Sequence, residues 1–385
     1  MKILINAYFL SRPYTGFGNY TIGLLKSLKK TKTLHKFYAM TPVEIDEDLR
    51  KSIEAEHLKL IIVPQNKFLP SVAAKWVWEQ FSIPKIAKKY RCDLIHNYYP
   101  STSIFTHIPQ ITTIHDVIPW VIKDYQNNIF VNLLRAFVKW SSHRAKKIIT
   151  ISNYSKHEIA RIFSIAPEKI SIIYCGFGEE FNKTISQSAK EEILQKYSII
   201  VPYIFYIGGF DARKNVKKMI IAFSNIAHQI NQKLVVAGGV FSPQKKIYAD
   251  YFQLPNLIKN LGIEDKVQFI GKIPAEDLPV LYQNADLFLS PTLAEGFNIP
   301  LLESFASKTP VICHNETATA EISAESAYEI DCSSADNISE AIIKLLDDEK
   351  LRKSIIDRQF QRAKFFSWDT AISTILDIYD TIKLD

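Results

Sequence analysis

Two glutamates eight positions apart carry the first candidate chemistry in this chain. Residues 293–304 read LAEGFNIPLLES, with Glu295 beside Gly296 and Glu303 beyond Pro300. Proline suits the first turn of a helix and acidic residues suit its N-terminal end, so an ordinary surface helix explains the pair taken alone. The alternative is a ligand site in which both carboxylates accept hydrogen bonds from sugar hydroxyls. The rest of the chain has to decide between the two.

The backbone between the glutamates could also bind a ligand. Gly296, Phe297, Asn298 and Ile299 lead from a predicted strand into a predicted helix. Exposed N–H groups at such a helix start hold hydroxyls or phosphate oxygens. In this interpretation Glu303, inside the helix, accepts two ribose hydroxyls, and Glu295, in the loop, does the same for a hexose.

A pair of cations forms the second candidate. The segment GGFDARKNVKK places Arg213 and Lys214 after a Gly208–Gly209 bend and just before a predicted helix. Arginine binds a diphosphate bidentately, lysine acts as a point charge, and the helix dipole adds to both. A solvated basic turn is the alternative.

Two weaker signals lie nearer the N-terminus. Gly16 and Gly18, in YTGFGNYT, precede a predicted helix, where glycines let a backbone approach an anionic ligand. This is only G-x-G, without the full dinucleotide fingerprint, and an ordinary loop explains it as well. His115 and Asp116, in TTIHDVIPW, end a predicted strand, so His115 is either a core histidine or a polar group facing a ligand.

The elements that must position these residues alternate between strands and helices. Near-continuous apolar strands separated by helices predict α/β domains, each a parallel sheet covered on both faces. In such sheets ligands bind at the carboxyl ends of the strands, which is where the candidate residues fall. The predicted strands lie at 2–8, 58–64, 92–99, 108–117, 145–152, 169–177, 203–209, 233–239, 266–271, 287–292 and 310–314. The predicted helices lie at 18–30, 76–90, 153–163 (capped by Asn153), 216–230, 251–262, 275–285 and 367–383.

The chain is long enough for two domains. At 385 residues it exceeds the size of one ordinary core. The strand pattern weakens over the polar stretch 179–200, so we expect a Rossmann-like N-terminal domain at 1–180 and a second at 181–365. The fold class is therefore α/β, with two αβα domains in tandem.

The charge is uneven along the chain. Residues 1–180 hold 25 lysines and arginines against 14 acidic residues, whereas the remainder is slightly acidic. A basic first half suits an anionic membrane surface or phosphorylated substrates, although a solvated surface explains it equally well. Its aromatic residues would suit membrane docking too, but core packing is the commoner role of such side chains. They are Phe17, Trp76, Trp78, Tyr98, Tyr99, Trp120, Phe130 and Trp140.

No feature predicts a metal or a disulfide. The four cysteines are scattered, which suits a reducing cytoplasm, and no His/Cys cluster has metal-ligand spacing. The one D-x-D-like run, Asp46 to Asp48, lies in a strongly charged segment that predicts a solvated helix. The N-terminus lacks a long apolar region and a cleavage site, so we expect a buried strand there and a cytoplasmic protein, located free or at the inner face of the membrane.

Taken together, these motifs resemble glycosyltransferase family 4, the retaining enzymes of the GT-B fold. The matching residues are Gly16 after the first strand, His115 in HD, Lys214 in RKN, and Glu295 with Glu303 in E-x7-E. WEQFSIP at 78–84, ADLFLSPTLAEGF at 285–297 and the closing FSWDTA extend the resemblance over nearly the whole chain. The segments IHDVIP and GGFDARKN are most similar to the corresponding segments of mannosyltransferase-like members.

The resemblance implies two domains facing each other across a cleft, with the helix at 366–385 returning to the N-terminal domain. It implies catalytic roles for His115, Lys214 and Glu295. It further implies a nucleotide-sugar donor, GDP-mannose favoured, a glycan or lipid-linked acceptor, and no metal or nucleic acid. Donor contacts are expected from Gly16, Gly18, Arg213, Lys214, Glu295, Gly296, Phe297, Asn298, Ile299 and Glu303.

Two positions depart from the family pattern. Many members carry an arginine where this chain has Gly209, so we expect Arg213 to supply the second cation. Many also have a small residue where this chain has Asn298, whose amide would add a contact to the donor. Three other functions remain open. They are a nucleotide-sugar epimerase of the same two-domain plan, a non-catalytic sugar-nucleotide binder, and an NAD-linked oxidoreductase, against which the missing glycine fingerprint argues.

Overall fold

The computed structural model describes residues 1–122, 129–239 and 249–382. It divides the chain into two compact units. The N-terminal unit consists of Met1–Gly176 and Ser367–Asp385, and the C-terminal unit of Phe177–Phe366. The sequence places these divisions at 180/181 and 365/366, within a few residues of the structural ones. None of the helices in the described ranges has the length and apolar character needed to span a bilayer.

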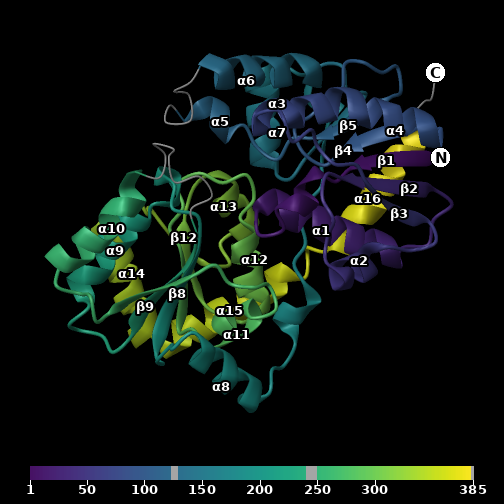
Figure 1. Ribbon diagram of the computed structural model, residues 1–385. Helices are drawn as coiled ribbons and strands as arrows, with labels where there is room; N and C mark the ends of the chain where they lie inside the picture. Colours follow the sequence, from purple (N-terminus) through teal and green to yellow (C-terminus); the bar gives the residue numbers. More distant parts are fainter. Residues whose placement is uncertain (123–128, 240–248, 383–385) are drawn as a thin grey trace. The chain divides into compact units, whose positions relative to one another are not determined.

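The N-terminal unit is built on a parallel sheet of seven strands within the described residues, in the order β3-β2-β1-β4-β5-β6-β7 (Figure 1). Ile5 of β1 lies opposite Ala39 of β2 on one side and His96 of β4 on the other. The strands are β1 (Lys2–Asn6), β2 (Lys36–Thr41), β3 (Leu58–Ile62), β4 (Leu94–Asn97), β5 (Gln110–Thr113), β6 (Lys147–Thr150) and β7 (Ile170–Ile172).

The strand order reverses at β1, and this sorts the helices. Because parallel crossovers are right-handed, connections that run in opposite directions from β1 cover opposite faces of the sheet. Helices α1 and α2 cover one face, and α3, α4, α6 and α7 the other (Figure 1). The helices are α1 (Gly16–Lys30), α2 (Glu47–Ile53), α3 (Ser71–Val77), the π-turn η2 (Trp78–Ser82), α4 (Ile83–Tyr90), α5 (Ile118–Val121), α6 (Ile129–Ser142) and α7 (Asn153–Phe163).

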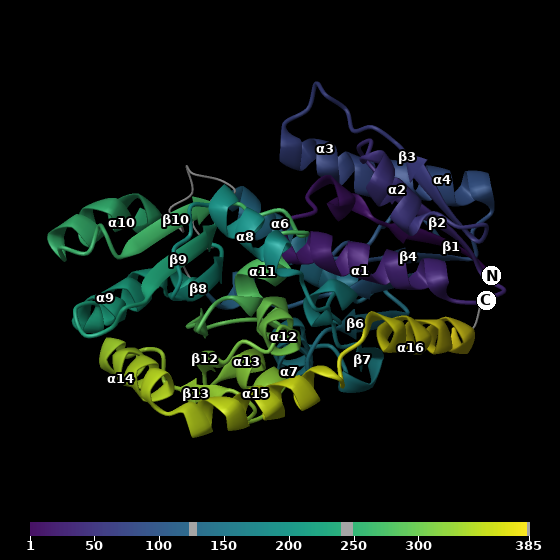
Figure 2. The same cartoon turned by 90° about the horizontal axis from the view of Figure 1, so that it is seen from below.

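The C-terminal helix α16 (Trp368–Thr381) packs against α1 within the N-terminal unit (Figure 2). The contact is close because Gly23 has no side chain. A Cβ there would lie 2.3 Å from the Trp368 ring. Ser27 donates to the Asp369 carboxylate at 2.6 Å, and Tyr379 meets the buried His96 Nδ1 at 2.6 Å. These polar contacts fix the position of the last helix on the first sheet.

The C-terminal unit repeats the design with six strands among its described residues, in the order β10-β9-β8-β11-β12-β13. Its strands are β8 (Tyr203–Gly208), β9 (Lys233–Gly238), β10 (Val267–Gly271), β11 (Leu287–Ser290), β12 (Val311–His314) and β13 (Tyr328–Ile330). Its helices are α8 (Gln187–Lys196), α9 (Val216–Ile226), α10 (Ala249–Asn260), α11 (Leu278–Gln283), α12 (Ile299–Ala306), α13 (Thr317–Ser323), α14 (Ala335–Asp347) and α15 (Glu349–Ala363). The order reverses at β8, whose neighbour is β11, so the carboxyl ends of these two strands form the switch point where ligands bind in such sheets.

The structure corrects several sequence-based details. Helix α7 is capped by Ser152, whose hydroxyl accepts from the Ser155 N–H at 3.0 Å, and Asn153 is its first residue. The strand predicted at 108–117 ends at Thr113, before His115. Strands β2 and β13 and helices α5, α6, α8, α13, α14 and α15 were not predicted. The solvated helix expected around Asp46 is confirmed, because α2 begins at Glu47 and Asp46 caps it.

Candidate functional site

The loop after β8 carries the two predicted cations. Arg213 and Lys214 end a short turn, Ala212–Lys214, that precedes α9. Asn215 follows in the left-handed region, with φ of 60°, and its amide donates to the carbonyl of Cys332 at 2.7 Å. The Leu293 N–H donates to the Arg213 carbonyl at 2.8 Å, so the loops after β8 and β11 are joined at the switch point.

These cations converge on Glu295. Nη1 of Arg213 donates to one carboxylate oxygen of Glu295 at 2.8 Å, and Lys214 Nζ contacts the other. Arg213 Nε also pairs with Asp211 at 2.9 Å, and the Thr292 hydroxyl lies 3.3 Å from Glu295. The structure therefore brings Arg213, Lys214 and Glu295 into one cluster, together with Asp211 and Thr292, which sequence reasoning did not identify.

The electrostatics of this cluster keep Glu295 ionised. Burial by itself would raise the pKa of the Glu295 carboxyl, but the charges of Arg213 and Lys214 and their hydrogen bonds outweigh it and lower the pKa to about 2. The three side chains are only 11% to 19% exposed, so water screens the ion pairs weakly. At neutral pH Glu295 is thus a hydrogen-bond acceptor and not a proton donor.

Glu303 lies in the opposite environment. It is in α12, 7% exposed, and the Tyr282 hydroxyl of α11 donates to it at 3.1 Å. Burial raises the pKa of Glu303 to about 7. The hydrogen bond from Tyr282 opposes this shift, and the charge of Glu180 adds to it. Glu303 is therefore close to half-protonated at neutral pH. Tyr282 carries no sequence signal, because it lies within an apolar helix of ordinary pattern.

The segment between the two glutamates differs in part from expectation. Phe297 is buried and its ring meets Phe366 edge-on at 5.8 Å, so its side chain belongs to the core. Asn298 has a φ of 82°, a conformation that asparagine tolerates better than most residues. Its amide nitrogen donates to Ser290 at 2.8 Å, and a contact of this side chain to a ligand stays a prediction. Backbone groups from Gly296 to Ile299 remain the candidates at the start of α12.

The glycines after β1 act differently from the prediction. Helix α1 begins at Gly16, so both glycines belong to its first turn and do not precede it. The Gly18 N–H donates to the Thr15 hydroxyl at 3.1 Å, and a Cβ on Gly18 would lie 2.2 Å from the Arg12 carbonyl oxygen. Gly18 is thus explained by the close packing of the loop. A Cβ on Gly16 would meet nothing within 4 Å, so the surroundings of this glycine are open.

His115 lies just beyond the carboxyl end of β5, packed between the rings of Phe17 and Tyr20 at 4.5 Å and 4.4 Å. Its Nε2 is 3.1 Å from the Tyr98 carbonyl and therefore carries the proton. Burial lowers the pKa of His115 to about 4, so the ring is neutral and Nδ1 is its acceptor. Asp116 turns back to accept from the Ile118 N–H at 3.0 Å.

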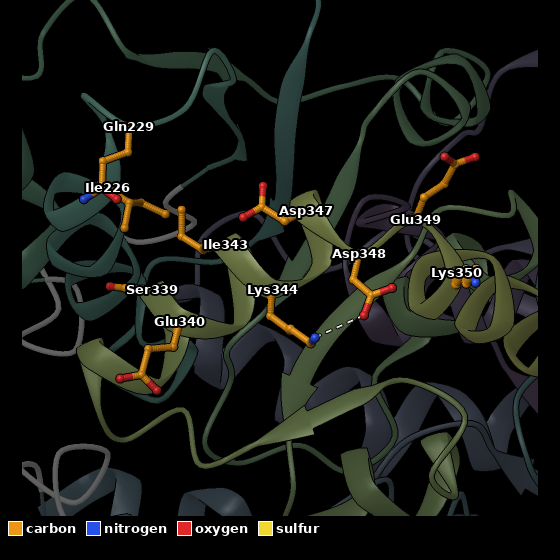
Figure 3. Close-up of a pocket in the computed structure, with 10 residues that line it drawn as sticks. All are labelled: Ile226, Gln229, Ser339, Glu340, Ile343, Lys344, Asp347, Asp348, Glu349 and Lys350. Atoms are coloured by element: carbon orange, nitrogen blue, oxygen red, sulfur yellow. Dashed lines mark ion pairs between the residues drawn. The ribbon is translucent and has the colours of Figure 1, made fainter.

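A separate pocket is lined by residues at the C-terminal end of α9, along α14 and at the start of α15 (Figure 3). Its charged lining residues are two lysines and four acidic residues, of which Lys344 and Asp348 pair at 3.0 Å. This excess of acidic residues does not suit an anionic ligand such as a diphosphate. In the described ranges no group of three or more His, Cys, Asp or Glu side chains is arranged to hold a metal ion.

Two family models cover most of the chain. "Glycosyltransferase Family 4" matches residues 15–181, and "Glycosyl transferases group 1" matches residues 189–362. The chain belongs to glycosyltransferase family 4. The predicted GT-B fold agrees with the two parallel α/β units and with the structural neighbours of this glycosyltransferase.

Two of the similar proteins are named as O-antigen chain mannosyltransferases. The O-antigen chain mannosyltransferase B of Escherichia coli is 25% identical over 98% of this chain and 99% of its own length. The O-antigen chain mannosyltransferase RfbU of Salmonella typhimurium is 25% identical over 80% of this chain and 81% of its own. Among solved structures, Anabaena HepE in complex with UDP and glucose has a TM-score of 0.77 and 17% identity, covering 99% of both chains.

Proposed function

We propose that this glycosyltransferase moves a hexose, mannose favoured, from a nucleotide-diphosphate sugar to a glycan or lipid-linked acceptor of a surface polysaccharide. GDP-mannose is the favoured donor, and the anomeric configuration is retained. The names of the O-antigen mannosyltransferase relatives support the sugar and the pathway class. The observation that carries the proposal is the cluster of Arg213, Lys214 and Glu295 at the switch point of the C-terminal sheet.

The cluster suits a diphosphate because its cations are held in position before a ligand arrives. Asp211 and Glu295 fix the Arg213 guanidinium at Nε and Nη1, and Glu295 fixes the Lys214 ammonium. Negative charge grows on the leaving diphosphate as the sugar–phosphate bond breaks. Preorganised cations stabilise that charge without reorganising during the reaction. In this proposal they do so without a metal ion.

The two glutamates take different parts of the donor. Glu295 stays ionised and accepts from hydroxyls of the transferred hexose, while its other interactions hold the cations. Glu303 accepts from the two ribose hydroxyls, and this favours its ionised form. Because the pKa of Glu303 is about 7 without a donor, donor binding then releases a fraction of a proton near neutral pH.

The proposed displacement runs on one face of the sugar. The acceptor hydroxyl attacks the anomeric carbon, the bond to the diphosphate breaks, and a phosphate oxygen takes the hydroxyl proton. Neutral His115 contributes Nδ1 as an acceptor for a sugar hydroxyl. A covalent glycosyl–carboxylate intermediate fits less well, because Glu295 is engaged by two cations and Glu303 by Tyr282.

The decisive experiment measures nucleotide released from a panel of nucleotide sugars, with and without membrane extract as the acceptor source. We expect one donor to turn over, GDP-mannose first among the candidates, and turnover to survive a chelator. Lys214→Ala removes a positive charge from the leaving group and should lower the rate at least about 100-fold. Glu303→Ala should lower it through weaker donor binding.

Lys217→Ala is the matched control, since this lysine lies three positions further on and is exposed on α9. Wild-type rates in both Lys214→Ala and Glu303→Ala would contradict the site. Conversion of the donor to an isomeric nucleotide sugar would identify an epimerase, and tight binding with no turnover would identify a binding protein.

A further inference from the structure

Five aromatic side chains form a continuous ridge on the N-terminal unit. In order they are Phe105, Phe81, Trp76, Phe137 and Trp140, and we call them the aromatic ridge. Phe105 and Phe81 stack at 4.9 Å with an angle of 15° between their planes. Trp76 lies 6.1 Å from Phe81 and 6.2 Å from Phe137, and Phe137 lies 6.0 Å from Trp140. The ridge joins α3 and the π-turn η2 to α6, on the same face of the sheet (Figure 1).

The ridge is open to solvent at both ends and in between. Phe81 is 50% exposed, Phe105 53% and Trp140 54%, and Leu133 on the same stripe of α6 is 64% exposed. Leu133, Phe137 and Trp140 are spaced i, i+4, i+7, so they share one helical face. Single exposed apolar residues are ordinary, but a contiguous aromatic surface marks an interaction site.

The protein holds this surface in place with buried hydrogen bonds. Pro84 has no N–H to donate, so the Gln80 carbonyl lacks the helical donor four residues on and accepts from the Ser103 hydroxyl at 3.2 Å. The Gln80 side chain is fully buried. It accepts from the Ile104 N–H at 2.9 Å and donates to the Thr102 carbonyl at 3.3 Å. These bonds tie the 102–104 loop to η2 and so align Phe105 on Phe81.

The sequence segments that carry most of the ridge are rich in basic residues. Residues 67–92 hold six lysines and arginines against one acidic residue, Glu79, which is buried and paired with Lys75 at 2.6 Å. Residues 129–149 hold five basic residues and no acidic one. Lys85 and Lys88 are exposed and follow Phe81 at i+4 and i+7, on the same side of the helix.

We propose that the aromatic ridge and its basic surroundings dock onto the surface of an anionic lipid bilayer. Tryptophan and phenylalanine favour the membrane–water interface, and lysine and arginine are attracted to anionic headgroups. A second copy of this chain fits less well, because self-association would bring two basic surfaces together. Of the other aromatic residues considered for membrane contact, Trp78, Tyr98 and Tyr99 are buried in the core. The side chain of Phe130 lies outside the described residues.

The experiment is flotation of the full-length protein with vesicles of two compositions. One is phosphatidylcholine alone, and the other is an equal mixture of phosphatidylcholine and phosphatidylglycerol. We expect binding to the mixed vesicles that weakens with added salt. The variant Phe81→Ser/Phe105→Ser/Trp140→Ser and the variant Lys85→Glu/Lys88→Glu should each bind the mixed vesicles at least about tenfold more weakly.

Matched controls come from the C-terminal unit. Phe252→Ser removes an aromatic side chain of similar exposure, and Lys259→Glu/Lys350→Glu makes the same change in net charge. Both should bind as the wild type does. Equal binding of both vesicle types, unchanged binding of the ridge variants, or ridge variants that alter only the oligomeric state would overturn the proposal.

Vesicle binding does not require the donor reaction, so the two proposals fail separately. Ridge variants should release nucleotide from the donor in solution at the wild-type rate, whereas Lys214→Ala should bind vesicles normally. A ridge variant that lost both activities would indicate misfolding, and its circular dichroism and melting temperature would show this. In that case the single variant Phe105→Ser, whose substitution lies in a loop outside the helices, is used to measure vesicle binding.

Discussion

Glu295 and Glu303 lie eight positions apart in one segment, and both are more than nine-tenths buried, yet their ionisation is opposite. Burial acts on both carboxyls in the same direction, toward the neutral form. Around Glu295 two cations outweigh it and lower the pKa to about 2. Around Glu303 only the Tyr282 hydroxyl opposes it, and the pKa rises to about 7. The comparison teaches that the charge partners of a buried carboxyl, and not its burial, decide which role it can take.

The difference also separates stability from function within one site. The Glu295 cluster contributes to folding, since its ion pairs form only when the loops after β8 and β11 meet. Glu303 is held where its ionisation is unfavourable. A carboxyl kept in a costly environment is typical of a functional group, because ligand binding can relieve the cost.

The largest expected effect comes from removing the charge of Glu295. Its folded pKa of about 2 lies below the ordinary value of about 4.3, so its stabilisation is complete above about pH 4.3 and is lost as pH falls through about 2. Glu295→Gln should therefore destabilise the protein at pH 7 by about 3 kcal/mol, which lowers the melting temperature by roughly 5–10 °C. Calorimetry of the variant measures this directly.

The exposed glutamate Glu276 supplies the control for this change. The variant Glu276→Gln should have the melting temperature of the wild type. If Glu295→Gln were as stable as the control at pH 7, the ion pairs of Glu295 would not stabilise the folded protein in solution. The contrast with Glu303 would then disappear.

The second effect has the opposite sign. The folded pKa of Glu303 lies above its ordinary value, so stability from this group is full below about pH 4.3 and is lost as pH rises to about 7. Glu303→Gln keeps an acceptor for Tyr282 and removes the ionisation, so it should gain up to about 3 kcal/mol over the wild type at pH 8. The gain should be much smaller at pH 5, as melting temperatures at the two pH values would show.

Donor turnover should fall in the same Glu303→Gln variant, since a neutral amide accepts more weakly from ribose hydroxyls than a carboxylate does. A variant that became less stable at pH 8 would mean that Glu303 is ionised and compensated in the folded protein. That result would remove the difference in ionisation between Glu303 and Glu295.

The smallest effect tests the one group that opposes burial at Glu303. Tyr282→Phe removes the 3.1 Å hydrogen bond, which favours the ionised carboxylate, so the pKa of Glu303 should rise further. The carboxyl ¹³C resonance of labelled glutamate, followed by NMR over a pH titration, measures this. We expect a loss of about 1 kcal/mol in stability at pH 8. An unchanged titration would mean that the Tyr282 hydrogen bond does not affect the pKa of Glu303, and that burial and the charge of Glu180 set it.

The sequence predicted the fold class, the division into two units and the candidate residues at the strand ends. These follow from local patterns, because apolar runs, helix periodicity and turn residues repeat in the order that a doubly wound sheet requires. The sequence did not predict β2, β13 or the helices between Thr317 and Ala363. The segments α14 and α15 are rich in charged residues, and their apolar positions become meaningful only beside the sheet that they cover.

Local pattern also did not give the hydrogen bonds that two of the candidate residues make within the protein. Asn298 and Gly18 were both predicted to contact a ligand, and this stays a prediction. In the structure the Asn298 amide donates to Ser290, and the Gly18 N–H donates to the Thr15 hydroxyl that caps α1. Such hydrogen bonds depend on neighbours that are distant in sequence or on backbone angles that a motif does not specify.

By itself, then, the amino-acid order determined which residues stand at the carboxyl ends of strands. It did so because the alternation of strand and helix depends on patterns of residues that are close together in the sequence. Only the tertiary structure decided which of them share an environment. Arg213 and Glu295 are 82 positions apart, and Tyr282 and Glu303 are 21 apart. Electrostatic interactions act through space, so the opposite ionisation of two similar glutamates appeared only once the chain had brought these partners together.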